Sequence, residues 1–269
     1  MPFIPDGRTL IQRAYERNYA MPAFNVFTFE MARACVEAAE AERAPIILQT
    51  YPGDLDQIPA RQAYAIVKSL AEEATVPIML HLDHGESFEM ASSCLRAGYS
   101  SVMFDGADYS LEENIQRTQE LAKFTDAVGA SLEVTADSFE DGDGITDPEA
   151  AARLLHKGNA TKVAVAVGSK HGQASHLDIK HLETIAQAVR APLVLHGGSG
   201  IPAEDLAEAV KLGVTKVNIG AALYRPVMRL WSESPAKEDH YQVLKAIREE
   251  LFEVARNKIS IMKASRQAP

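Results

Sequence analysis

The sequence predicts an α/β fold, a single (β/α)8 barrel of the TIM-barrel type with an N-terminal helix and a C-terminal helical extension. Short β-branched or apolar runs recur along the whole chain, and a stretch of helical periodicity follows each of them. The chain has 269 residues, of which 46% are hydrophobic, and this size suits one such barrel. We therefore expect residues 1–269 to form a single domain.

Eight runs have the composition of buried parallel strands, and eight strands close a parallel barrel. These runs are Met21 to Val26, Pro45 to Thr50, Pro77 to Asp83, Ser101 to Gly106, Ala130 to Thr135, Lys162 to Gly168, Pro192 to Gly197 and Lys216 to Gly220. An open doubly wound sheet is the alternative. No glycine-rich dinucleotide fingerprint follows the first run, and this favours the closed form.

Alanine- and glutamate-rich segments between these runs have the spacing of helices that cover a barrel. Examples are Glu30 to Arg43, Arg61 to Ala74, Leu111 to Phe124 and Ala203 to Leu212. The short helix Thr9 to Asn18 is predicted to plug the bottom of the barrel. Segment Tyr241 to Ile259 places Val243, Leu244, Ile247, Leu251 and Val254 on one helical face. That last helix is predicted to close the fold or to form an oligomer contact.

The charge and the cysteines exclude several classes of function. The formal net charge of −10 comes from acidic residues scattered along the chain, which argues against a nucleic-acid partner. The N-terminus lacks the pattern of a signal peptide, and no window approaches the roughly 20 apolar residues of a membrane span. Cys35 and Cys94 form no CxxC pair and are expected to pack in the core. We expect a reduced, cytoplasmic protein without a membrane partner.

Three histidines lie at the ends of predicted strands. His84 follows the third strand, His171 follows the sixth, and His196 ends the seventh. In a parallel barrel this edge carries the active site. Three imidazoles with an open fourth position are typical of catalytic zinc, which prefers tetrahedral nitrogen coordination. A lone histidine here is more often structural, but three at matching positions predict one Zn²⁺ per chain, other divalent metals being possible.

Asp83 directly precedes His84, so its carboxylate is expected beside the metal. There it could exchange a proton with a substrate hydroxyl while the metal stabilises an enediolate, which makes Asp83 the predicted acid/base. The alternatives are that Asp83 orients a histidine ligand or caps the next helix. His81 points to the same side of a regular strand as Asp83, where it either supports the ligands or packs in the core.

A glycine-rich turn follows the seventh strand. Gly197 to Gly200, with Ile201 and Pro202 before a helix, could present backbone amides and the Ser199 hydroxyl to an anion. A tight turn between a strand and a helix also uses glycine, so the motif alone is weak. Its place after the seventh strand favours a phosphate, because barrel phosphate sites commonly use the loops after strands seven and eight.

At these residues the chain closely resembles the class II fructose- and tagatose-bisphosphate aldolases, nearly from end to end. The matching motifs are Pro22-Ala-Phe-Asn-Val26, His81-Leu-Asp-His-Gly85, Gly168-Ser-Lys-His-Gly172 and His196-Gly-Gly-Ser-Gly-Ile-Pro202. The resemblance implies zinc ligation by His84, His171 and His196, with Asp83 as the proton donor or acceptor at the aldol hydroxyl. It also implies a homodimer or homotetramer and a sugar or sugar phosphate substrate.

Further pocket residues are carried over from the same resemblance. Gly172, Gly197 and Ser199 are expected to help hold a phosphate. Asn218 is expected to contact the reacting carbon skeleton, and Asn25 and Thr50 are expected to line the pocket.

The chain departs from the family pattern after its fifth strand. Where the family usually has Glu-Ala-Glu-Leu-Gly, this chain has Glu133-Val-Thr-Ala-Asp137. The family's glycine-rich mobile loop, which carries an acidic residue used in proton transfer, is shortened here to Ser138-Phe-Glu-Asp-Gly-Asp-Gly-Ile145. Glu140 or Asp141 is a candidate substitute for that acid.

A second departure follows the eighth strand. The family's phosphate-binding Asn-x-Asp-Thr becomes Asn218-Ile-Gly-Ala221, which removes a carboxylate and a hydroxyl from the expected anion site. Arg225 lies nearby and could bind a phosphate, carboxylate or sulfonate, since guanidinium forks onto such anions. The alternative is that Arg225 is a surface salt-bridge partner.

Three functional hypotheses follow from these residues. The first is a carbon–carbon lyase that reversibly cleaves a ketose (bis)phosphate or a related ketose. The second is a metal-dependent epimerase or isomerase of a sugar or sugar acid, which would use the same enediolate chemistry and would explain the missing phosphate residues. The third is a degenerate, non-catalytic barrel. The presence of Asp83 with all three histidines argues against the third.

Overall fold

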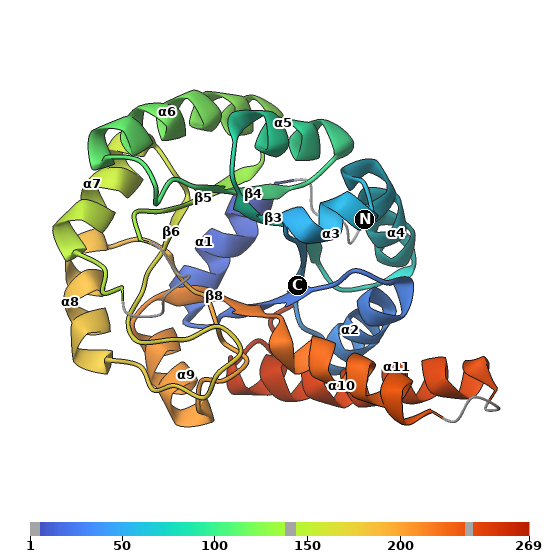
Figure 1. Cartoon of the computed structure of the whole chain (residues 1–269). Coiled ribbons are helices and arrows are strands. Elements are labelled where there is room, and N and C mark those ends of the chain that lie inside the picture. Colours follow the sequence, from blue (N-terminus) through green and yellow to red (C-terminus); the bar gives the residue numbers. More distant parts are fainter. Residues whose placement is uncertain (1–5, 138–143, 235–238, 269) are drawn as a thin grey trace.

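The computed structural model describes residues 6–137, 144–234 and 239–268 and shows a closed barrel of parallel strands (Figure 1). The strands are β1 (Met21–Asn25), β2 (Ile46–Thr50), β3 (Ile78–Gly85), β4 (Ser101–Asp105), β5 (Ser131–Thr135), β6 (Lys162–Ala164), β7 (Leu193–Leu195) and β8 (Val214–Ile219). Each strand pairs with the next one in the chain, and β8 pairs with β1. The predicted (β/α)8 barrel is confirmed, and the open sheet is excluded.

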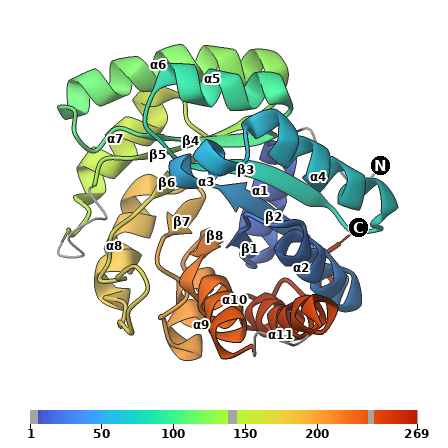
Figure 2. The same ribbon diagram turned by 45° about the vertical axis from the view of Figure 1, so that its right-hand side comes forward.

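Helices surround the strands in both views of the molecule (Figures 1 and 2). They are α1 (Gly7–Arg17), α2 (Phe29–Glu42), α3 (Pro52–Gln57), α4 (Ala60–Glu73), α5 (Phe88–Ala97), α6 (Leu111–Val128), α7 (Pro148–Gly158), α8 (Ile179–Val189), α9 (Ala203–Lys211), α10 (Ala221–Glu233) and α11 (His240–Ile261). Hydroxyl caps begin several of them: Thr28, Ser87 and Ser110 each accept a backbone N–H of the first turn. Within the described ranges, none of these helices combines the length and the apolar character that a bilayer span requires.

The C-terminal ends of three strands differ by two residues or more from the sequence prediction. β6 and β7 stop after Ala164 and Leu195, earlier than expected, and the glycines that follow them, Gly168 and Gly197, have φ of 97° and 71°. Such left-handed backbone does not continue a strand. β3 instead continues past Asp83, although His84 itself has a φ of 51°. An unusual backbone conformation at a non-glycine residue often marks a functional position.

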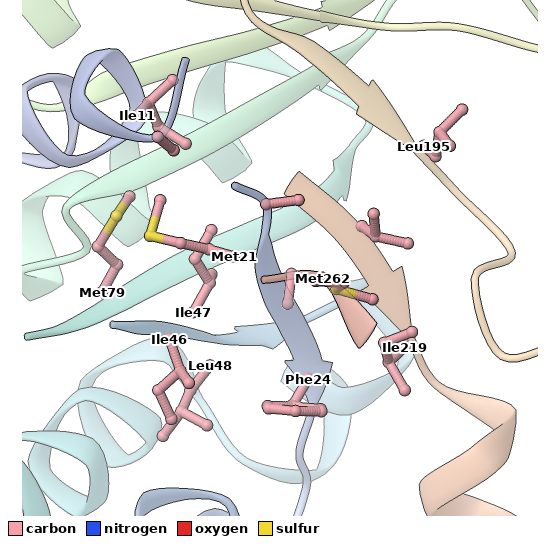
Figure 3. Close-up of a cluster of buried hydrophobic side chains, with 14 of the residues drawn as sticks. Ile11, Met21, Phe24, Ile46, Ile47, Leu48, Met79, Leu195, Ile219 and Met262 are labelled. Carbon is pink, nitrogen blue, oxygen red and sulfur yellow. The ribbon is translucent and has the colours of Figure 1, made fainter. Parts of the chain in front are cut away.

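Side chains alternate between the barrel interior and the surrounding helices. Figure 3 shows Met21, Ile47 and Met79 on one side of their strands, whereas Ile46 and Leu48 point to the other. This period of two means that every second residue of each strand enters the interior. Residues further along the same interior columns are therefore brought together at the C-terminal end of the barrel.

Helix α1 covers the N-terminal end of the barrel, as the sequence predicted. A side-chain atom added at Gly7 would meet Met79 and the Ser100 carbonyl, at the starts of β3 and β4. Ile11 of α1 is fully buried and lies on the same side of the strands as Met21 and Met79 (Figure 3). This apolar contact seals one end of the interior and leaves the opposite end for polar groups.

Helix α11 packs mainly on α2 of its own barrel and also lies beside α10 (Figures 1 and 2). Its residues Ile247, Leu251 and Ile259 are buried. The Arg256 guanidinium also bonds the Glu42 carboxylate of α2 at 2.8 Å. Of the two roles that the sequence left open for this helix, closing the fold is the one that these contacts support.

Truncating the buried face of α11 should therefore destabilise the whole barrel. Leu251→Ala removes a fully buried side chain and should lower the free energy of unfolding by about 2–5 kcal/mol. Urea denaturation followed by circular dichroism measures the change. Glu253→Ala, whose parent side chain is 68% exposed, is the control and should stay within about 0.5 kcal/mol of the parent. Equal effects of the two substitutions would contradict this packing.

Candidate active site

A cavity of about 850 Å³ opens at the C-terminal ends of the strands. Residues from the ends of β1 to β4 and of β6 to β8 line it. Asp83, His84 and His171 are among them. In a parallel barrel this edge is the one on which active sites are built, and the cavity has the size of a site for small molecules.

The three histidines predicted from the sequence converge at this cavity. One ring nitrogen from each of His84, His171 and His196 lies within 4.8 Å of the others. His84 comes from the end of β3, His196 follows β7, and His171 lies in the loop after β6. Their ring centroids are 4.7 to 6.1 Å apart. Residues far apart in the chain thus form one cluster of nitrogen donors.

Two of these rings are each oriented by a carboxylate of their own. His84 bonds Asp105 through Nδ1 at 2.7 Å, and His196 bonds Glu133 through Nε2 at 3.0 Å. The remaining nitrogens, Nε2 of His84 and Nδ1 of His196, face each other at 3.0 Å. Carboxylates on the outer nitrogen are characteristic of histidines that ligate metals, since they fix the ring and make the inner nitrogen more basic. The donor set therefore fits a divalent ion that prefers nitrogen ligands.

The electrostatic surroundings of the two rings differ. Burial lowers the pKa of His196 to about 4 and outweighs the bond to Glu133, so this imidazole is neutral at pH 7. Burial also acts to lower the pKa of His84, but the carboxylates of Asp83 and Asp105 outweigh it and raise that pKa to about 9. The carboxylates around His84 thus favour positive charge at this point of the cavity.

Asp83 is buried and held by three amide side chains. Asn218 donates to its Oδ1 at 2.7 Å, while Asn25 and Gln49 each donate to its Oδ2 at 3.1 Å. Gln49 also donates to Asn25 at 2.9 Å, which fixes the orientation of both amides. The carboxylate therefore has one defined position at the cavity wall. Its Oδ1 lies 4.0 Å from Nε2 of His84.

The environment keeps Asp83 ionised. Burial acts to raise its pKa, but the nearby positive charge of His84 and Lys216 and the bond from Asn25 outweigh burial and lower the pKa. An ionised carboxylate can accept a proton from a bound hydroxyl group.

Beneath the histidines lies a buried charged cluster centred on Glu133. Its Oε2 is 3.0 Å from the Lys216 ammonium and 3.6 Å from that of Lys162. Lys216 also donates to Asn218 at 2.6 Å. Although burial acts to raise the pKa of Glu133, Lys216 and the His196 bond lower it well below its usual value. The interior of this barrel is thus ionic in its middle and apolar at its closed end.

On the β6 to β8 side, backbone groups form a polar corner. Gly172, Gly197 and Ser199 all line the cavity. The Ser199 hydroxyl accepts the Ala222 amide at 3.1 Å, which ties the turn after β7 to the start of α10. Arg225 donates to the Gly172 carbonyl, so its guanidinium lies at the edge of this corner. The corner lies where the sequence predicted an anion site.

A family model described as fructose-bisphosphate aldolase class-II matches residues 6–267. This chain belongs to the class II fructose-bisphosphate aldolase family. It is therefore a carbon–carbon lyase, as the sequence predicted, and the family is generally zinc-dependent. Since the match covers nearly the whole chain, the family applies to the barrel and to its C-terminal helix alike.

Solved structures agree with this assignment. The YdjI aldolase from Escherichia coli K12 is 29% identical and has a TM-score of 0.89, with 99% of this chain and 100% of that chain covered. The fructose-bisphosphate aldolase from Campylobacter jejuni is 22% identical and has a TM-score of 0.81, with 98% and 96% covered. The second likeness supports the fold alone.

Thr50 lies elsewhere in this aldolase than the resemblance implied. Its hydroxyl bonds Tyr99 at 2.8 Å, and Thr50 lines a small separate cavity beside Asp54 rather than the main one. The reason is the alternation along β2: Gln49 points into the interior, toward Asp83, so Thr50 points away. The other predicted residues line the main cavity, apart from His196, which is buried beside it, and Arg225, at its edge.

Sequence reasoning did not single out Gln49, Asp105 or Tyr224. Gln49 precedes Thr50, Asp105 ends β4, and Tyr224 lines the cavity from α10. A search for polar residues at every strand end would have found Asp105, whereas nothing local distinguishes Gln49 or Tyr224. Glu140 and Asp141, the candidate loop acids, lie outside the described residues.

Removing the carboxylate on His84 should weaken metal binding by this aldolase. Asp105→Asn keeps a hydrogen-bond acceptor beside Nδ1 but removes the charge, and should lower the affinity for Zn²⁺ about 10- to 100-fold. Competition with a chromogenic chelator measures the affinity. Asp126→Asn, which removes a carboxylate at a surface pair with Arg8, should leave it unchanged. An unchanged affinity in Asp105→Asn would show that this carboxylate does not support the ligand.

Proposed function

We propose that this chain reversibly cleaves a ketose phosphate, or a related ketose, with one Zn²⁺ held by His84, His171 and His196. The observation that carries the proposal is the convergence of these three histidines beside Asp83 in one cavity. The same nitrogen ligands also suit other divalent metals. When bound, zinc supplies a Lewis acid that polarises the carbonyl group of the ketose.

Asp83 is the proposed acid/base. In the cleavage direction its carboxylate takes the proton from the hydroxyl at the bond that breaks, and in condensation it returns that proton. Two features support this role. The three amides hold its oxygens in place, and the surrounding positive charge keeps it ionised. In this arrangement Asn25 and Asn218 serve both to orient Asp83 and to line the cavity.

The polar corner on the β6 to β8 side is the proposed place for the anionic group of the ketose. Gly172, Gly197 and Ser199 supply backbone amides and a hydroxyl there. Arg225 is the proposed replacement for the carboxylate and hydroxyl that this chain lacks at Gly220 and Ala221. Its support is the hydrogen bond to the Gly172 carbonyl, which places the guanidinium at this corner.

An epimerase or isomerase of a sugar or sugar acid is the second candidate. Gly220 and Ala221 favour this second candidate, because they lack the carboxylate and the hydroxyl with which the family binds a phosphate. Product analysis by NMR separates the two reactions, since cleavage yields two shorter carbonyl compounds and epimerisation preserves the carbon count.

We further propose that residues 1–269 act as one catalytic domain and that the chain forms a homodimer or homotetramer in the cytoplasm. The continuous core from α1 to α11 supports the first point. Met228, Trp231 and Tyr241, which are exposed apolar residues on α10 and α11, support the second, because such residues are enriched at interfaces. Light scattering measures the mass, and a monomer would contradict it.

Two changes test the proposed chemistry. Removal of zinc by a chelator should abolish ketose cleavage, and added Zn²⁺ should restore it. Asp83→Asn keeps the size of the side chain and one acceptor oxygen for the surrounding amides, and should lower kcat by roughly 10²- to 10⁴-fold, since the carboxylate that takes the proton is lost. Elemental analysis should still find one zinc per chain in this variant. Turnover near the parent rate in zinc-loaded Asp83→Asn would exclude Asp83 as the acid/base.

A further inference from the structure

The two sides of the active-site cavity carry opposite charge. β2, β3 and β4 are neighbours in the closed barrel, and β6, β7 and β8 are neighbours on the other side of the ring. Loops after the first group and loops after the second group therefore face each other across the cavity. A ketose that spans the cavity places one end on each side.

The β6 to β8 side is basic. Arg225 donates to the Gly172 carbonyl, and the Lys258 ammonium donates to the Gly198 carbonyl at 2.9 Å. Both cations thus lie against the turns that present Gly172 and Ser199 to the cavity. This side suits the anionic end of the ketose assigned to it above.

The β2 to β4 side is acidic and aromatic. Glu86, Asp105 and Asp108 line it together with the rings of Tyr51 and Tyr109. Glu86 and Asp108 are exposed, and neither has an ion-pair partner in the described ranges of the chain. Their carboxylates are therefore free to interact with a substrate group on this side of the cavity.

The basic side chains among the described residues that line the cavity are His84 and His171. None of the lining residues in the described ranges is a lysine or an arginine. Of the residues outside those ranges, 1–5, 138–143 and 269 contain neither in the sequence, and 235–238 contain Lys237. Arg117 lies 4.1 Å from the centroid of the Tyr109 ring, but it pairs with Glu113 and does not line the cavity.

We propose that the aldehyde half of the substrate carries hydroxyl groups and no phosphate, and that Glu86 and Asp108 determine this specificity. The inference rests on the function proposed above and narrows its substrate class to ketose monophosphates. Carboxylates accept hydrogen bonds from sugar hydroxyls, and tyrosine rings pack against the C–H faces of a sugar. A second phosphate on this side would meet two like charges, and no lysine or arginine of the described residues lines the cavity to offset them.

The condensation reaction tests the proposal directly. The zinc-loaded full chain is given dihydroxyacetone phosphate with either D-glyceraldehyde or D-glyceraldehyde 3-phosphate, and kcat/KM is measured for each aldehyde. The unphosphorylated aldehyde should be preferred by roughly tenfold or more, and the preference should fall as salt screens the repulsion. Equal use of both aldehydes, or preference for the phosphorylated one, overturns the proposal.

Charge removal identifies the residues responsible. The double variant Glu86→Gln/Asp108→Asn should reduce the preference by roughly tenfold, because the repulsion is lost. Glu89→Gln/Glu120→Gln is the matched control: it removes the same net charge from two exposed residues outside the cavity lining and should leave the preference unchanged. The preference is a ratio within one preparation, so partial misfolding cancels. An equal effect of both double variants would overturn the assignment to Glu86 and Asp108.

A separate measurement distinguishes failure of this inference from failure of the proposed function. Zinc-loaded enzyme should exchange a proton of dihydroxyacetone phosphate with deuterium from D₂O without any aldehyde present, since proton transfer at the carbon beside the carbonyl needs the metal and a base of the protein but no aldehyde. Absence of exchange would contradict the proposed function. Exchange together with a preference for the phosphorylated aldehyde would contradict the specificity proposal alone.

Discussion

The carboxylate of Glu133, buried at the centre of the barrel, is the group on which the arrangement of the active site depends. It bonds His196 on one side and Lys216 on the other. Lys216 in turn donates to Asn218, which donates to Asp83. One negative charge thus positions both His196 and, through Lys216 and Asn218, Asp83. A buried carboxylate is stable only when such partners compensate its lost hydration, so none of these contacts can be removed without cost to the others.

Strand alternation gives this network its order. Met79, His81 and Asp83 are successive interior residues of β3, and they lead from the apolar closed end through the charged middle to the cavity. β8 follows the same sequence of layers with Lys216 and Asn218. The parallel register places these columns side by side. An interior that is usually filled by branched apolar residues is here used to support polar groups at the open end.

The departures from the family pattern have a structural counterpart at the start of α10. A side-chain atom at Gly220 would lie 3.3 Å from Oδ1 of Asn25 and 3.4 Å from the Tyr224 ring. Tyr224 therefore occupies space next to a position where the family carries an aspartate, and it lines the cavity there. Glycine at this position leaves no acidic side chain there, and the Tyr224 ring beside it gives the pocket wall an aromatic surface.

The sequence by itself determined the barrel, because eight apolar runs alternate with helical segments and this pattern is local. It also determined that three histidines and Asp83 lie at one end of the barrel, because each of them follows or ends a strand of a parallel sheet. Only the tertiary structure decided that Gln49 rather than Thr50 faces Asp83, and that Asp105 and Glu133 hold the outer nitrogens of His84 and His196. These contacts depend on the register of the strands, which closure of the barrel fixes. They also depend on where β6 and β7 end, which the backbone conformations of Gly168 and Gly197 fix. Such features join residues distant in the chain, so no local pattern encodes them.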